Sequence, residues 1–298
     1  MGGKVSMVVP ARHRWRRYVR VVGGVLVLSL VTLVLAPDDA LAKAGTRAAH
    51  RSQAALPRHR GHLYVRDTFR RPVSGSWGRA RPGGRWEVAK GQSGNFAVAN
   101  GQGIVAARAA YFLSGEQILV LPRANRLSYV GSFTVSFDEN INNYGPQHGG
   151  VVAYLVARFQ DTGATGYYRM GLVWEGSTRH LWLRTQTPAG QKNPGDFTSQ
   201  IDTLIDPTKD FGGPPYSYNV MVQITGTNPT SFASKVWKVG TTEPANWMLT
   251  GTDLKNLGPQ VAGPIGFRVS NDLYTGSGNY VNYTAHVQVA NLVVAPAG

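Results

Sequence analysis

The chain has 298 residues, of which 42% are hydrophobic and only 16% are charged, with 36 glycines and 17 prolines. Few charges together with many glycines are typical of short strands joined by tight turns, and the length suffices for one sizeable core or two small ones. Cysteine is absent, which excludes disulfides, a thiolate nucleophile and a zinc–thiolate cluster.

The formal net charge of +15 is concentrated near the amino terminus. Residues 1–42 contain six basic and two acidic residues (net +4), and residues 43–85 contain eleven basic residues and one acidic residue (net +10). Residues 86–298 contain fourteen basic and thirteen acidic residues (net +1). Because most of the chain is nearly neutral, we expect no nucleic acid partner.

Residues 1–42 have the parts of a secretory signal. Five arginines lie from Arg12 to Arg20, an apolar run follows over Val21–Ala36, and the small-x-small triplet Ala40-Leu41-Ala42 comes last. The apolar run is shorter than the ~20 residues that span a bilayer. We therefore predict a signal peptide over 1–42 and a secreted or cell-surface protein. An uncleaved membrane anchor formed by the same apolar run is the alternative.

Residues 43–62 are rich in arginine, histidine and alanine and have no strand pattern. This composition predicts a basic, disordered linker. Two roles stay open for it. The linker could adhere by charge to an anionic envelope surface, or it could be a solvated spacer.

From Tyr64 onward, apolar and polar residues alternate over short runs that Gly, Pro, Asn and Asp interrupt. No window has a sustained helical period. The pattern predicts one all-β domain over 63–298, a sandwich of about a dozen antiparallel strands. The expected strands are 64–69, 85–89, 95–99, 103–108, 117–121, 132–138, 151–160, 167–175, 180–185, 218–225, 231–239, 265–270 and 281–294.

Several motifs carry a more specific resemblance. They are Asp67–Arg71, Ser76–Gly78, Gly83–Trp86, Phe96–Gly101, Val222–Thr230, Lys235–Trp237 and Glu243–Trp247. With these motifs the chain resembles the concanavalin A-like or laminin G-like jelly-roll domains of actinobacterial exported proteins and of their phage tail proteins. The resemblance implies a concanavalin A-like jelly-roll sandwich over 65–294. It implies little about activity, because the fold hosts lectins, glycosidases, lyases and adhesion modules.

The acidic residues do not follow the spacing of jelly-roll glycosidases. Those enzymes place two acids two residues apart on one strand, so that both carboxylates point to one face. No two acids after residue 62 have this separation, and the Gln-x-His and Arg-x-Glu-x-Arg strands of related lyases are also absent. Acids from different strands could still converge, so the sequence assigns no catalytic residue without excluding catalysis.

Strand alternation predicts one candidate binding surface. On strands 151–160, 167–175 and 180–185 the apolar side chains share one side, and aromatic and arginine side chains share the other. Aromatic rings cover the C–H face of a pyranose, and guanidinium groups bond hydroxyl or anionic groups. Ordinary cross-strand pairing is the other interpretation. The candidate ligand-binding residues are Tyr154, Arg158, Tyr167, Arg169, Trp182 and Arg184.

Asp138, Asn140 and Asn142 begin an oxygen-rich loop that is similar to a calcium loop. Gly149 stands where the bidentate glutamate of such a loop would be, so a calcium site and a plain turn with Asx hydrogen bonds both stay open. No other cofactor is expected.

Taken together, these patterns predict a secreted or cell-wall-associated glycan-binding or adhesion module without catalytic activity. Its expected partner is a polysaccharide or cell-envelope glycan, with the basic linker contacting the anionic envelope surface. Two alternatives stay open. One is a polysaccharide-active hydrolase or lyase on the same fold, and the other is a structural surface domain with no ligand.

Overall fold

The structure is a computed structural model that describes residues 62–108, 115–137, 150–160, 166–175, 180–187, 200–206, 217–271 and 284–297. These residues belong to one compact unit, His50–Gly298. The predicted signal peptide, linker residues 43–61 and the predicted calcium loop from Asp138 lie outside the described residues. In the part of the chain that is described, no helix has the length and apolarity needed to cross a membrane.

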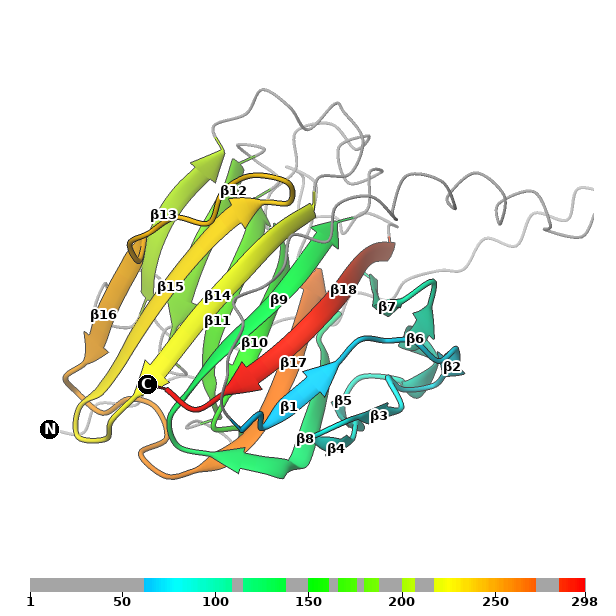
Figure 1. The fold of residues 1–298 in the computed structure, drawn as a ribbon, viewed down its shortest axis with the longest axis horizontal. Helices are drawn as coiled ribbons and strands as arrows, with labels where there is room; N and C mark the ends of the chain where they lie inside the picture. The colour runs from blue at the N-terminus through cyan, green and yellow to red at the C-terminus, as the bar shows by residue number, and fades with distance from the viewer. Residues whose placement is uncertain are drawn as a thin grey trace, which may run out of the picture. The chain divides into compact units, whose positions relative to one another are not determined.

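The described residues form an all-β sandwich of antiparallel sheets, which confirms the predicted fold class (Figure 1). The larger sheet has nine strands in the order β16, β15, β14, β9, β18, β7, β6, β2, and β1 pairs with β18. Its strands are β1 (Val65–Asp67), β2 (Val73–Ser74), β6 (Phe96–Ala99), β7 (Gln102–Arg108), β9 (Tyr129–Phe137), β14 (Ser217–Thr225), β15 (Thr230–Lys238), β16 (Leu249–Asp253) and β18 (Thr284–Ala295).

The second sheet has seven strands in the order β13, β12, β11, β10, β17, β8, β5. A short ribbon, β3 (Arg79–Ala80) with β4 (Gly84–Arg85), and one 3-10 turn at Ser93–Asn95 complete the described elements. The strands of the second sheet are β5 (Glu87–Lys90), β8 (Gln117–Arg126), β10 (Gly150–Ala157), β11 (Tyr168–Glu175), β12 (His180–Gln186), β13 (Gln200–Asp206) and β17 (Gly263–Asn271).

The main core lies between the two sheets. Leu155 of β10 and Leu172 of β11 meet Phe133 of β9 and Val220 of β14 there, and all four side chains are fully buried. Close sheet packing explains one glycine of β9, because a Cβ at Gly131 would lie only 2.6 Å from a Leu155 methyl carbon. Along β10 and β11 the side chains alternate with a period of two, so the residues between these apolar ones point away from the core.

Three of the motifs that carry the resemblance, Asp67–Arg71, Ser76–Gly78 and Gly83–Trp86, form a packed cluster beside β1. The rings of Phe69 and Trp86 each lie 5.1 Å from the ring of Trp77, edge to face. Asp67 joins the cluster, since its Oδ1 accepts a hydrogen bond from the Phe69 amide (2.9 Å) and its Oδ2 accepts one from Trp86 Nε1 (2.8 Å). These tryptophans therefore stabilise the fold, as edge-to-face aromatic pairs do.

The segment from Gln160 to Gly166 joins β10 to β11, which pair antiparallel along their full length. The Gln160 amide donates to the carbonyl oxygen of Gly166 at 2.7 Å. β10 and β11 therefore form a hairpin.

Candidate active site

The face of the seven-stranded sheet that points away from the core carries the cluster of interest. Tyr154 of β10 stands opposite Arg268 of β17 in the register, and Arg169 of β11 stands opposite Val156 of β10. The neighbours of these polar residues along each strand, such as Leu155 and Met170, lie in the core. Strand alternation therefore brings one tyrosine and two arginines from three adjacent strands to the same face.

Glu116, directly before β8, joins this face through its carboxylate. Oε1 accepts a hydrogen bond from the Tyr167 hydroxyl (2.8 Å) and pairs with Arg268 Nε at 2.6 Å. Oε2 pairs with Lys90 Nζ of β5. We call Tyr154, Tyr167, Arg169, Arg268 and Glu116 the arginine–tyrosine cluster.

The electrostatics of the cluster fix Glu116 as a carboxylate. Burial alone would raise its pKa, but the charge of Arg268 and the hydrogen bonds from Lys90 and Tyr167 outweigh burial and lower the pKa of Glu116 to about 2. Glu116 thus carries its negative charge throughout the physiological pH range and cannot donate a proton there.

Arg169 is the least compensated cation of the cluster. Only 3% of the residue is exposed, and its Nε has no hydrogen-bond partner within the described residues. The guanidinium carbon lies 5.4 Å from the centre of the Tyr167 ring. Burial and the charge of Arg268 lower the pKa of Arg169 to about 10. Burial of a guanidinium carries a desolvation cost, which an anionic group in contact with it would offset.

The two tyrosines supply hydroxyl groups beside these cations. Burial raises the pKa of Tyr167 to about 12, and its hydroxyl already donates to Glu116, so Tyr167 stays protonated at neutral pH. Tyr154 packs under Arg268, with 5.9 Å from the guanidinium carbon to the ring centre. Tyr154 also acts electrostatically on Arg169. The cluster therefore joins positive charge to groups that can exchange a proton.

β12 provides the partly exposed margin of this face. Trp182, Arg184 and Gln186 are half-buried, whereas Leu181 and Leu183 between them are fully buried in the core. Trp182 Nε1 donates to a Glu175 carboxylate oxygen at 3.1 Å. A ligand that approaches the cluster along β12 would meet the indole of Trp182 and the guanidinium of Arg184.

Five of the six predicted ligand-binding residues share this face, and the sixth does not. Tyr154, Arg169, Trp182 and Arg184 lie on strands of the sheet, and Tyr167 directly precedes β11 with the same alternation. The structure leaves their proposed contact with a ligand as a prediction. It corrects one expectation, because Tyr154 is only 1% exposed and Arg169 is also buried, so the centre of the face is not an open sugar-binding platform.

The placement of Arg158 on this face is wrong. Arg158 follows the last residue of β10 and has a φ of 54°, in the left-handed region, which ends the strand alternation. Its fully buried guanidinium donates to the carbonyl oxygens of Leu127 (2.8 Å) and Gly226 (2.6 Å). It also donates to Pro259 O (3.0 Å) and Thr230 Oγ1 (2.8 Å). Arg158 is therefore a structural residue that joins three turns.

Glu116 and Arg268 are the members of the cluster that the sequence alone did not identify. Alternation within the expected strand 265–270 places Arg268 opposite the apolar Phe267 and Val269, so a signal for Arg268 existed. Glu116 lies just outside an expected strand, and its pairing with Arg268 joins residues far apart in the chain. No local pattern predicts that contact.

Within the described residues, no group of three or more histidine, aspartate and glutamate side chains could hold a metal ion. The candidate calcium ligands Asp138, Asn140 and Asn142 lie outside those residues, so calcium binding stays a prediction.

No family model and no curated protein sequence matches the chain. Several solved structures share its fold. An alginate lyase, Aly36B, in complex with alginate trisaccharide is 10% identical over 73% of this chain and 90% of its own, with a TM-score of 0.43. The β-glucanase of Bacillus licheniformis is 13% identical over 80% and 100%, with a TM-score of 0.44. A β-1,3-glucanase from Mycobacterium marinum is 14% identical over 79% and 100%, with a TM-score of 0.47.

These comparisons agree with the concanavalin A-like sandwich and correct the predicted function. The similar structures are polysaccharide lyases and glycanases, together with a pseudo β-1,3-glucanase of Mycobacterium tuberculosis. The prediction of a binding or adhesion module without catalytic activity is therefore wrong on this comparison, which favours the alternative of a polysaccharide-active hydrolase or lyase. At such low identity the likeness is one of fold alone, so an activity must be argued from the cluster itself.

Proposed function

We propose that the protein is a polysaccharide lyase that cleaves an acidic glycan at the arginine–tyrosine cluster. The observation that carries this proposal is Arg169, a buried guanidinium whose Nε has no hydrogen-bond partner within the described residues. A charged group this poorly compensated costs stability, and a carboxylate of the substrate would supply its counter-charge. Guanidinium groups bind carboxylates well because the two planar groups can form parallel hydrogen bonds.

The reaction that fits these groups is β-elimination at a uronate residue. Arg169 neutralises the substrate carboxylate, which makes the proton on C5 more acidic. Tyr154, as the phenolate beside the positive charges of Arg169 and Arg268, accepts that proton, and the C5–H electron pair forms the C4=C5 double bond as the C4–O4 bond breaks. Tyr167, which is protonated at neutral pH, would donate a proton to the departing O4, after which Tyr154 returns its proton to solvent and Tyr167 regains one from solvent.

Hydrolysis fits the described groups less well. Glycoside hydrolases need two carboxyl groups, one of which is protonated before it donates to the leaving oxygen. Glu116 has a pKa of about 2 and pairs with Lys90 and Arg268, so it is neither an acid nor a free nucleophile. Glu175 accepts a hydrogen bond from Trp182. The cationic and phenolic character of the cluster therefore supports elimination.

A substrate panel tests this proposal. Wild-type protein is incubated with polyuronates and, separately, with neutral β-glucans, and the release of new chain ends is measured. We expect cleavage of a polyuronate and no cleavage of neutral glucans. Cleavage of neutral glucans alone would contradict the proposal.

Arg169→Met is the matched variant for this panel. It keeps the length of the side chain and removes the charge, so it should abolish cleavage of the polyuronate. Because Arg169 is poorly compensated, the melting temperature should stay the same or rise. Arg158→Met is the control, since it removes a buried arginine that already has four hydrogen bonds and should lower the melting temperature.

We propose a setting that suits this activity. Export by the predicted signal peptide over 1–42 would bring the enzyme to an extracellular or envelope polysaccharide. The basic residues of 43–62 would then hold it near an anionic surface by charge, an interaction that salt would weaken.

A further inference from the structure

Six arginines surround a hollow at β1 and the β3–β4 ribbon, and its lining shares no residue with the arginine–tyrosine cluster. The hollow has a volume of about 680 Å³, which lies within the ~300–1,000 Å³ of typical ligand pockets. All six arginine residues are exposed. The arginines of the lining are Arg66, Arg70, Arg71, Arg79, Arg81 and Arg85.

No acidic side chain among the described residues balances the positive charge of this lining. None of the six side chains forms an ion pair within the described residues. Asp67 is the one acid among the described lining residues, and both of its oxygens already accept hydrogen bonds, from the Phe69 amide and from Trp86 Nε1. The hollow thus concentrates positive charge that an anion from outside can neutralise.

The floor of the hollow is closely packed. The Trp77 ring packs edge to face against Phe69 and Trp86, and its Nε1 donates to the carbonyl oxygen of Ile104 at 3.2 Å. Gly103 of β7 permits this packing, because a Cβ there would lie 2.7 Å from the Phe69 ring and 2.8 Å from the Trp77 ring. A closely packed floor lowers the entropy cost of holding a ligand in one position.

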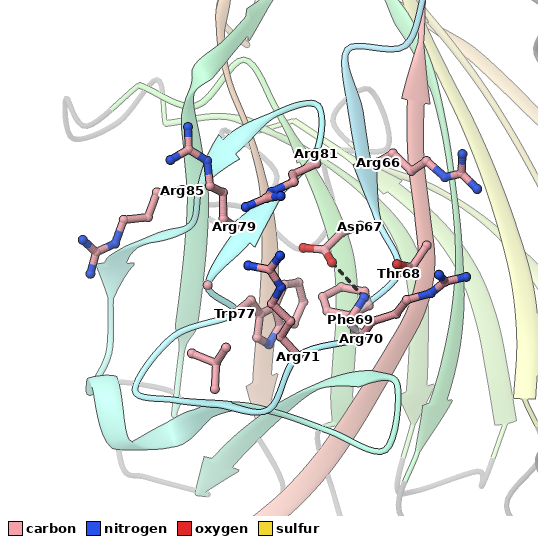
Figure 2. A pocket seen from close by; sticks show the side chains of 12 residues that line it. Arg66, Asp67, Thr68, Phe69, Arg70, Arg71, Trp77, Arg79, Arg81 and Arg85 are labelled. Atoms are coloured by element: carbon pink, nitrogen blue, oxygen red, sulfur yellow. Dashed lines mark hydrogen bonds between the residues drawn. The ribbon is translucent and has the colours of Figure 1, made fainter.

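Figure 2 shows how the arginines are arranged around this floor. The side chains of Arg71 and Arg81 extend toward the middle of the view, near Trp77 and Asp67, whereas those of Arg66, Arg70 and Arg85 extend outward at its margins. Arg71 and Arg81 are therefore the side chains best placed to contact an anion inside the hollow.

A second hollow of about 530 Å³ adjoins the first, since Arg79 and Arg81 line both. It adds Arg123 and Arg126 to the basic surface. The guanidinium of Arg126 stacks over the Tyr64 ring at 4.2 Å, and its Nε has no hydrogen-bond partner within the described residues. Two adjoining cationic hollows suit a chain with repeated negative groups better than a single small anion.

We infer that this surface, which we call the arginine hollow, is a second binding site for a segment of an acidic polysaccharide. Each guanidinium can form a two-point contact with a carboxylate or sulfate group of the sugar chain. The choice of a sugar polymer rests on the proposed function, whereas the choice of a polyanion rests on the charge and shape of the hollow. A single-stranded nucleic acid fits less well, because the lining rings of Phe69 and Trp77 are each only 2% exposed and offer no stacking surface.

The test measures binding of a labelled polyuronate oligosaccharide by fluorescence anisotropy. The protein carries Arg169→Met in every arm, so that turnover is absent and any binding at the arginine–tyrosine cluster is the same in all arms. Adding Arg71→Gln with Arg81→Gln should weaken binding about tenfold or more. The matched control adds Lys238→Gln with Lys255→Gln, which should leave the affinity unchanged. Lys238 is the last residue of β15, Lys255 follows the end of β16, and both are exposed.

Each result decides the inference. Equal affinity for the arginine variant and the control, or no binding before those substitutions, would overturn it. Equally tight binding of duplex DNA or polyphosphate would overturn the assignment to a sugar chain, whereas sulfated and carboxylated oligosaccharides both belong to the inferred class. Equal melting temperatures of the arginine variant and the control would show that the variant loses binding and not folding. If Arg71→Gln with Arg81→Gln does not fold, Arg79→Gln replaces it and should also weaken binding.

Failure of this inference is distinguishable from failure of the proposed function. Oligosaccharide binding without any cleavage by the wild type would remove the lyase proposal and leave the arginine hollow. If the wild type cleaves the polysaccharide but the arginine substitutions do not change binding, the lyase proposal stands and the arginine hollow is not a binding site.

Discussion

Replacing Glu116 by glutamine should lower the free energy of unfolding, because the Glu116 carboxylate pairs with Arg268 and Lys90. In the folded state the pKa of Glu116 is about 2, against an ordinary value of 4.5. That difference corresponds to about 3 kcal/mol of stabilisation at neutral pH. The stabilisation arises because the buried carboxylate compensates Arg268 and Lys90, which would otherwise face each other as like charges.

The direction in which folding shifts the pKa of Glu116 determines how its contribution to stability depends on pH. Because folding lowers the pKa of Glu116, its contribution is complete above the unfolded value near 4.5 and is lost as the pH falls toward about 2. Urea unfolding of wild type and of Glu116→Gln, measured at neutral and at acidic pH, gives the difference in stability between the two proteins. We expect about 3 kcal/mol at pH 7 and a difference that shrinks steadily below pH ~4.5.

Glu243→Gln is the control for this comparison. It removes a partly exposed carboxylate that pairs with Lys235 at 2.6 Å, and such pairs contribute only ~0–1 kcal/mol. If Glu116→Gln were as stable as the wild type at pH 7, or if their difference did not change with pH, the assigned charge balance of the cluster would be incorrect.

Three further predictions concern other parts of the chain. Arg158→Met should lower the free energy of unfolding by ~3–5 kcal/mol, because three carbonyl groups lose their donor, and unchanged urea unfolding would contradict the structural role of Arg158. Amino-terminal sequencing of the exported protein should begin at Lys43, whereas a full-length product in the membrane fraction would indicate an anchor. If Asp138, Asn140 and Asn142 bind calcium, the ion should raise the melting temperature and a chelator should reverse the increase; no shift would rule out a stabilising calcium site.

The sequence predicts the sandwich well wherever strands alternate strictly. Core-facing and outward-facing residues alternate over 151–157 and 168–175, which lie in β10 and β11. The expected strand 151–160 runs too far, because β10 ends at Ala157. β13 was missed because its pairing with β12 shifts register between Leu181 and Trp182, so the apolar residues near its end follow no period of two. β16 was missed because Leu249 is its only large apolar residue.

The candidate site is less predictable, because it depends on contacts between distant residues. Alternation correctly groups Tyr154, Arg169 and Trp182 on one face, since that grouping needs only the period of the strand. It cannot show that Glu116 compensates Arg268, 152 positions away in the chain. It also fails at Arg158, where a left-handed backbone turns the side chain away from the face.

The most direct test of the proposed function is the chemical nature of the new chain end. β-Elimination leaves a C4=C5 double bond on the new non-reducing end, which absorbs ultraviolet light and lowers the product mass by one water relative to hydrolysis. We predict that a polyuronate treated with wild-type protein gains this absorbance in step with new reducing ends. New reducing ends without the double bond would identify a hydrolase and contradict the elimination assigned to Tyr154 and Arg169.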